Sequence, residues 1–101
     1  MQVKDFFLVI ELKSHSAEMV CCKNSHLFAN YANEIKDVTL QSEDQRFSMM
    51  IFLRQSCNVI ARVTNAIWFN SINKDELFKI TSNRNLGALP SEFLLEISLP
   101  Q

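Results

Sequence analysis

The sequence predicts an α+β fold, and within that class a ferredoxin-like βαββαβ sandwich with two helices on one face of a four-stranded antiparallel sheet. The hydrophobic periodicity changes along the chain in the order strand, helix, strand, strand, helix, strand. A chain of 101 residues can build one core without disulfides. Its 48% apolar and 21% charged residues are close to globular averages. We therefore expect one α+β domain over residues 1–101.

Residues 3–12 predict the first strand, because apolar residues alternate along them. One side of the strand carries Phe6, Leu8, Ile10 and Leu12. The other side carries Phe7 and Val9 between charged ends. A strand that is apolar on both faces at its centre is usually an interior strand. The sequence therefore places this segment at the centre of the sheet.

A helix is predicted from about residue 17 to residue 36, with Ser14 or Ser16 as its cap. Its apolar stripe consists of Val20, Leu27, Phe28, Tyr31 and Ile35. A shorter helix that begins after Ser25, with residues 17–25 extended, is the alternative that the sequence leaves open.

Two strands are predicted next, after a polar loop over residues 37–45. The strongly apolar run 46–54 predicts the first of them, and the alternating run 59–69 predicts the second. Residues 55–58 form the four-residue turn of the hairpin in this interpretation. Which face of strand 46–54 is buried depends on register, which the sequence does not define.

The last two elements are a short helix and a final strand. Ser71 or Asn73 predicts the start of the helix, which continues to about Ser82. Gly87, the only glycine, follows this pattern where a C-terminal cap is expected. Alternation over residues 91–99 predicts the final strand.

This layout leaves one face of the sheet without helices, and that face is apolar. Exposed apolar patches larger than a few hundred Å² are rare on monomers, so something is expected to cover it. A second copy of the chain, another protein or a ligand, and the 37–45 loop or a terminus are the three possibilities. The candidate interface residues are Phe7, Val9, Met50, Phe52, Ile60, Arg62, Trp68 and Leu94.

No catalytic constellation stands out, and we expect no cofactor and no metal. The nearest approach to a metal site is Cys22 with His26, which share one face of a helix at a spacing of four. Their spacing relative to His15 and Cys21 matches no usual zinc pattern. The leading hypothesis is a non-enzymatic interaction module that forms a homodimer through its apolar sheet face.

Composition excludes several other classes. Ten basic and 11 acidic residues give a net charge of -1, which argues against binding to nucleic acid or an anionic membrane. A single glycine excludes Gly-rich phosphate loops. The apolar run at residues 6–10 is too short for a membrane span. Three cysteines are too few for a disulfide framework, so we expect a cytoplasmic protein.

The stretch RFSMMIFLRQ…VIARVTNAIWFNSINKDELFKI is similar in rhythm to part of a known family. It resembles the strand–strand–helix part of dimeric α+β-barrel proteins of the antibiotic-biosynthesis-monooxygenase type. The resemblance implies a dimer made by pairing bare sheet faces. It also provides the alternative function, a small-molecule-binding or monooxygenase-like dimer, which a pocket lined by Phe7, Arg62 and Trp68 would favour.

Overall fold

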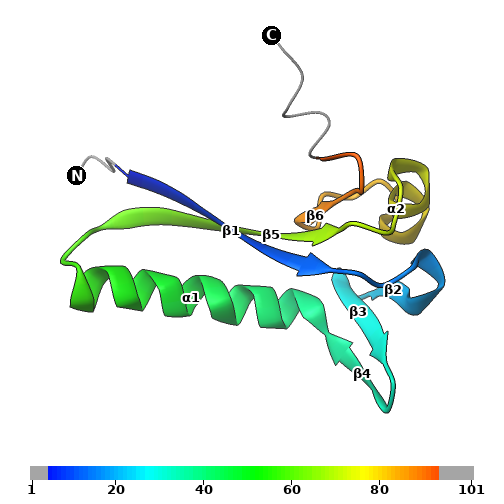
Figure 1. Cartoon of the computed structure of the whole chain (residues 1–101), viewed down its shortest axis with the longest axis horizontal. Coiled ribbons are helices and arrows are strands. Elements are labelled where there is room, and N and C mark those ends of the chain that lie inside the picture. Colours follow the sequence, from blue (N-terminus) through cyan, green and yellow to red (C-terminus); the bar gives the residue numbers. More distant parts are fainter. Residues whose placement is uncertain (1–4, 94–101) are drawn as a thin grey trace, which may run out of the picture.

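The computed structural model describes residues 5–93 and is α+β, as predicted, with two small sheets and two α-helices (Figure 1). The elements, in chain order, are β1 (Asp5–Lys13), the 3-10 helix η1 (Ala17–Met19), β2 (Val20–Lys23), β3 (His26–Tyr31), β4 (Glu34–Asp37), α1 (Val38–Ser56), β5 (Ala61–Phe69), α2 (Lys74–Thr81) and β6 (Ala88–Leu89).

The larger sheet has the strand order β1-β5-β6, and all of its pairs are parallel. Phe7 lies opposite Val63 and Leu12 lies opposite Trp68. Parallel neighbours need a crossover, and β2 to α1 together supply the connection from β1 to β5. The predicted four-stranded antiparallel sheet is therefore wrong. Among the strands in residues 5–93, β1 is an edge strand and β5 is the central one.

Residues 38–56 form the helix α1, where the sequence predicted the loop 37–45, the strand 46–54 and part of a turn. The Asp37 carboxylate caps this helix and accepts a hydrogen bond from the backbone N–H of Leu40 (2.9 Å). The segment lacks Gly and Pro and is rich in Gln, Met, Leu and Arg, which favour helices. A short apolar run alone does not distinguish a strand from a buried helix.

The predicted helix over residues 17–36 is also wrong, because this segment forms η1 and the antiparallel sheet β2-β3-β4. Asn24 and Ser25 both have positive φ (53° and 63°), which suits the two-residue turn between β2 and β3. Leu27 and Ala29 are fully buried, two positions apart. This period of two, rather than the helical stripe, describes the core residues of the segment.

The predictions of β5 and α2 are confirmed. Asn73, one of the two expected caps, begins α2 in a capping box with Glu76. Gly87 is not the C-terminal cap, because Ser82 has the left-handed conformation (φ 54°) at the end of α2. Gly87 has φ 74°, and its carbonyl accepts a hydrogen bond from the Ile67 N–H (2.7 Å). Of the predicted strand 91–99, residues 91–93 are not a strand and the remainder lies outside the described residues.

The core lies where the carboxyl end of β5 meets the small sheet and α2. Its buried side chains are Val20, Leu27, Ala29, Val38, Ile67, Phe69, Ile72 and Leu77. None of them comes from β1. The amino-terminal half of β1 therefore extends beyond the core, with α1 on one side of it (Figure 1).

Candidate interaction surface

The side of β1 that faces away from α1 is apolar and exposed. Alternate side chains of a strand point to opposite faces. Val9 lies beside α1 in a shared groove, and Asn65, its partner in β5, donates a hydrogen bond to Ser42 of α1 (2.7 Å). The odd-numbered residues of both strands therefore face α1. We name the opposite set the β1 outer face: Phe6, Leu8, Ile10 and Leu12.

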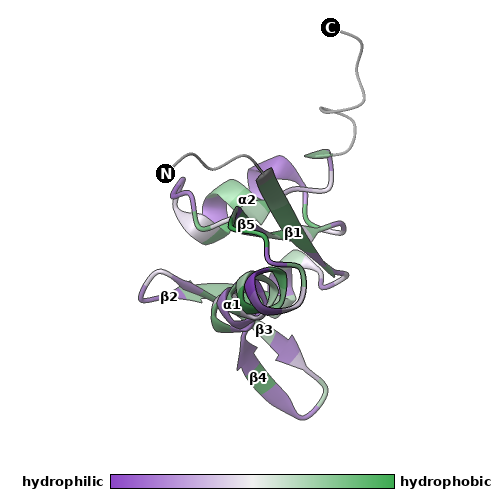
Figure 2. Cartoon of the chain, turned by 90° about the vertical axis from the view of Figure 1, so that its left-hand side faces the viewer, coloured by the Kyte–Doolittle hydropathy of each residue, from purple (hydrophilic) through white to green (hydrophobic). Residues whose placement is uncertain are grey.

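Each residue of the β1 outer face is at least 40% exposed, and Phe6 reaches 64%. Parallel sheets normally have both faces covered. Figure 1 shows α1 on one side of β1 and β5 and no described helix opposite it at their amino-terminal end. In Figure 2, β1 is green, that is hydrophobic, along most of its length. The β1 outer face is thus a strip of large apolar side chains without a described cover.

The same face is better covered on β5. The Trp68 indole donates a hydrogen bond from Nε1 to the Pro90 carbonyl (3.0 Å), and its ring meets Phe93 edge-on at 6.3 Å. Ala66 is buried at 8% exposure. The uncovered area is therefore centred on β1.

On the α1 side, a shallow groove of about 470 Å³ runs between β1 and α1. We name it the β1 edge groove. Val9 is its only residue from β1, and α1 provides Asp44, Gln45, Ser48, Met49 and Phe52. No residue of β5 lines it, so it lies on the β1 side of the helix. Both sides of the β1 edge therefore present apolar groups.

The carboxyl end of β1 differs from the rest of the strand because it carries a half-buried polar cluster. The Lys13 ammonium donates a hydrogen bond to the Tyr31 hydroxyl (2.7 Å) and forms an ion pair with Glu11 (3.1 Å). The Lys13 and Glu11 side chains are only 12% and 17% exposed. Burial lowers the pKa of Lys13, but the hydrogen bonds with Tyr31 and Glu11 outweigh it and raise the pKa above its ordinary value.

Two atoms near this cluster are buried without a hydrogen-bond partner within the described residues: Glu11 Oε2 and His15 Nδ1. The His15 ring meets the Tyr31 ring edge-on at 4.7 Å. Burial, with the nearby Lys13 charge, lowers the pKa of His15. The cluster therefore attaches the carboxyl end of β1 to β3.

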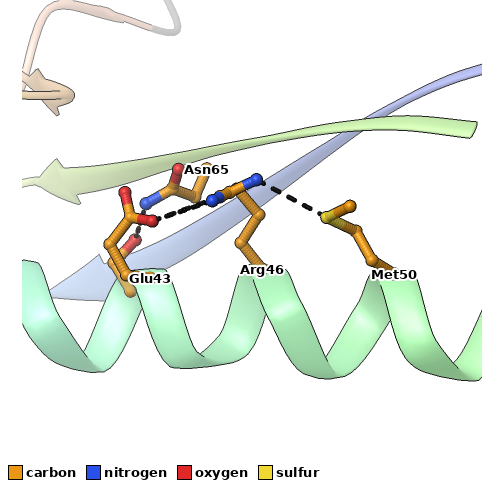
Figure 3. A network of polar contacts seen from close by, with 5 residues as sticks. Glu43, Arg46, Met50 and Asn65 are labelled. Atoms are coloured by element: carbon orange, nitrogen blue, oxygen red, sulfur yellow. Dashed lines mark hydrogen bonds and ion pairs between the residues drawn. The ribbon is translucent and has the colours of Figure 1, made fainter.

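A polar network beneath the sheet attaches α1 (Figure 3). Arg46 pairs with Glu43 (3.1 Å) one turn earlier in the helix and donates a hydrogen bond to the Met50 sulfur (3.5 Å). Asn65 reaches from β5 to Ser42, which is buried. Of these contacts, the bond between Asn65 and Ser42 joins the helix to the sheet, and α1 packs mainly on β5 rather than on β1, which leaves the groove beside β1 open.

The Cys22 and His26 pair does not form a site. In the β2-β3 ladder Cys22 lies opposite Leu27 and packs against the core, whereas His26 lies opposite Lys23. His26 Nδ1 instead donates to Asp37 (2.7 Å). The helical spacing that would have joined Cys22 and His26 is absent. Within residues 5–93, no group of three or more His, Cys, Asp or Glu could hold a metal ion.

The structure divides the predicted interface residues among several places. Val9 and Phe52 share the β1 edge groove, and Phe7 faces α1 by its position in β1. Met50 and Ile60 line a second pocket. Arg62 and Trp68 lie on the opposite face of β5, and Leu94 is outside the described residues. The expectation that Phe7 and Val9 lie on the face without helices is wrong, because α1 lies on the Val9 side and leaves the side of Phe6, Leu8 and Ile10 without a described helix.

The second pocket has a volume of about 200 Å³ and lies between α1 and the start of β5. Its walls are mainly apolar, with Phe47, Ile51 and Ile60 each about half exposed. Arg54 is the only charged residue in the lining. Among the described residues, no ion pair involves Arg54. Phe7, Arg62 and Trp68, the expected lining, do not contribute.

The chain matches no known family model, and no curated protein or solved structure is significantly similar to it. The resemblance to the monooxygenase-type barrels depends on a strand over residues 46–54, which is part of α1. Across the described part of the chain, no helix is both long and apolar enough to cross a membrane.

The sequence analysis identified the four residues of the β1 outer face as one apolar side of the first strand. It placed the exposed face on the opposite side, however, with Phe7 and Val9. It also missed Met49 as a groove residue, because a strand over 46–54 placed it wrongly. One signal was present: Asp37 before a segment without Gly or Pro is typical of a helix start.

Proposed function

We propose that this chain is a non-enzymatic protein-interaction module that self-associates through β1. One observation carries the proposal: four large apolar side chains of the β1 outer face are 40–64% exposed, in a parallel sheet that needs both faces covered. Cys21, Cys22 and Cys57 are free, which supports the further proposal of a cytoplasmic location.

The test is the molar mass in solution, measured by light scattering over a tenfold dilution series. We expect the wild type to form a dimer of about twice 11.7 kDa. The double variant Leu8→Lys/Ile10→Lys places like charges in the association surface. Such juxtaposition costs several kcal/mol, so we expect the dissociation constant to rise at least about 100-fold.

The matched control is Ile35→Lys/Phe78→Lys, which adds the same charge at two side chains that are 66% and 56% exposed elsewhere. This variant is expected to remain dimeric. A wild type that is monomeric throughout the series would refute the proposal. So would a control variant that dissociates as readily as the β1 variant. Circular dichroism of each variant verifies that it is folded.

A second candidate function, binding of a small amphipathic carboxylate, is favoured by the pocket between α1 and β5. Ligand sites combine apolar walls with a few polar groups that orient the ligand. Arg54 provides such a group, and the rest of the lining is largely apolar. At about 200 Å³ the pocket is smaller than the usual 300–1,000 Å³, so it suits only a short chain.

Titration calorimetry and amide NMR with octanoate test this second candidate. We expect shifts at residues 59–61 and in the second half of α1, and a loss of binding of about tenfold in Arg54→Gln, since one charge-assisted hydrogen bond contributes about 1.5–3 kcal/mol. Arg62→Gln, on the opposite face of β5, is the control and should bind normally. Equal binding of neutral octanol would contradict the role of Arg54.

A further inference from the structure

The free edge of β1 lacks the features that usually prevent edge-to-edge pairing. Natural edge strands carry charges, prolines or bulges, or are short. β1 has nine residues and no proline, and its charged residues lie toward its ends, outside the apolar run over residues 6–10. Both of its faces are apolar along residues 6–10, which is typical of an interior strand, yet within residues 5–93 it pairs only with β5. A second strand along this edge would remove the discrepancy.

Resting on the self-association proposed above, we propose that the second strand is β1 of another copy, paired antiparallel in a register centred on Val9. A twofold axis that passes between the two β1 strands at Val9 then relates the two copies. The pairing joins two three-stranded sheets into one sheet of six strands. Residue i of one copy faces residue 18 minus i of the other.

This register is self-complementary on the β1 outer face. It places Phe6 opposite Leu12 and Leu8 opposite Ile10 of the other copy, so each residue of the β1 outer face meets another apolar one, whereas on the other face Phe7 lies opposite Glu11. Directly opposed apolar side chains in antiparallel strands stabilise the pairing. At the strand ends, Asp5 and Lys13 occupy the same register position, so the register sets no two residues of like charge opposite each other.

On the α1 side, the register sets Val9 against Val9 at the axis. The β1 edge groove of each copy then opens toward the same groove of the other, which brings together Met49 and Phe52 from both copies of α1. Because α1 is held under β5, it does not block the β1 edge. Edge pairing therefore gives apolar groups on both sides of the strand new cross-strand neighbours, whereas stacking of two outer faces leaves the groove open.

Disulfide trapping tests the register in a background with Cys21→Ser, Cys22→Ala and Cys57→Ser. Opposed residues in antiparallel strands have Cα atoms about 4.5–5.5 Å apart, within the range of a disulfide. Val9→Cys is therefore expected to form a covalent dimer under mild oxidation. Phe6→Cys alone is not expected to form one, because residue 6 of one copy lies six residues along the strand from residue 6 of the other, a distance of about 20 Å.

A mixture of Phe6→Cys and Leu12→Cys is expected to form the mixed disulfide, since these residues face each other. In urea, Val9→Cys and Phe6→Cys should react equally slowly. A wild-type dimer in which Val9→Cys is not trapped would overturn the register but leave self-association intact. A wild type that is monomeric by light scattering would overturn both.

Discussion

The adjacent strands β1 and β5 are equally long and paired along their whole length, yet their surroundings differ. In β5, Val63, Ile67 and Phe69 are at most 6% exposed. In β1, no residue from 6 to 13 is fully buried, and Phe6 and Leu12 are more than half exposed. The more continuously apolar of the two strands is thus the more exposed one.

This difference teaches that, within residues 5–93, the apolar composition of β1 is not matched by burial. The β5 side chains find their cover within the molecule, in α1, the small sheet and α2. Burial of a large apolar side chain stabilises a protein by about 1.5–3 kcal/mol, and β1 obtains little of this in one copy. Its apolar residues are consistent with a surface that is buried only on association.

The largest expected effect on stability comes from shortening one side chain in each strand. Phe69→Ala removes a side chain with 0% exposure and is expected to lower the free energy of unfolding by about 3–5 kcal/mol. Leu8→Ala, at 49% exposure, should lower it by about 1 kcal/mol or less when the protein is dilute and monomeric. Urea denaturation, followed by circular dichroism, measures both effects.

The concentration dependence of these measurements sharpens the result. At concentrations where the wild type is dimeric, the effect of Leu8→Ala should increase, because its cross-strand contact is also lost. The effect of Phe69→Ala should be the same at both concentrations. A Leu8→Ala effect as large as that of Phe69→Ala in dilute solution would show that β1 is already covered within the monomer.

How far the fold could be predicted depended on local signals. The alternation in β1 and β5 and the cap residues before α2 identified those elements, because their patterns have a single interpretation. Residues 49–53 form an apolar run, which fits a strand and a helix equally. The parallel pairing of Phe7 with Val63 joins residues more than 50 positions apart, and no local pattern encodes it.

The candidate surface was predictable in kind but not in detail. An apolar face without a cover follows from the strand compositions alone. Which face lacks a cover does not follow from composition, because both sides of β1 are apolar. If the helix covers one side, the exposed set contains Leu8, and if it covers the other, the exposed set contains Val9. The position of α1 decides between the two sides, and it rests on long-range packing against β5, including the bond between Asn65 and Ser42, which no local pattern encodes.

The smallest expected effect concerns the Lys13 and Tyr31 contact, which joins the carboxyl end of β1 to β3. A double-mutant cycle of Lys13→Met and Tyr31→Phe should give a coupling energy of about 1–2 kcal/mol at pH 7, as expected for a charge-assisted, half-buried hydrogen bond. Because the pKa of Lys13 is raised in the folded protein, the contribution is complete below its unfolded value of about 10.4 and is lost as the pH rises through the folded value. The coupling should therefore decrease as the pH is raised through the folded pKa of Lys13. A coupling that persists at high pH would mean that the neutral groups alone hold this end of β1. A coupling near zero at pH 7 would mean that this contact does not attach the carboxyl end of β1 to β3.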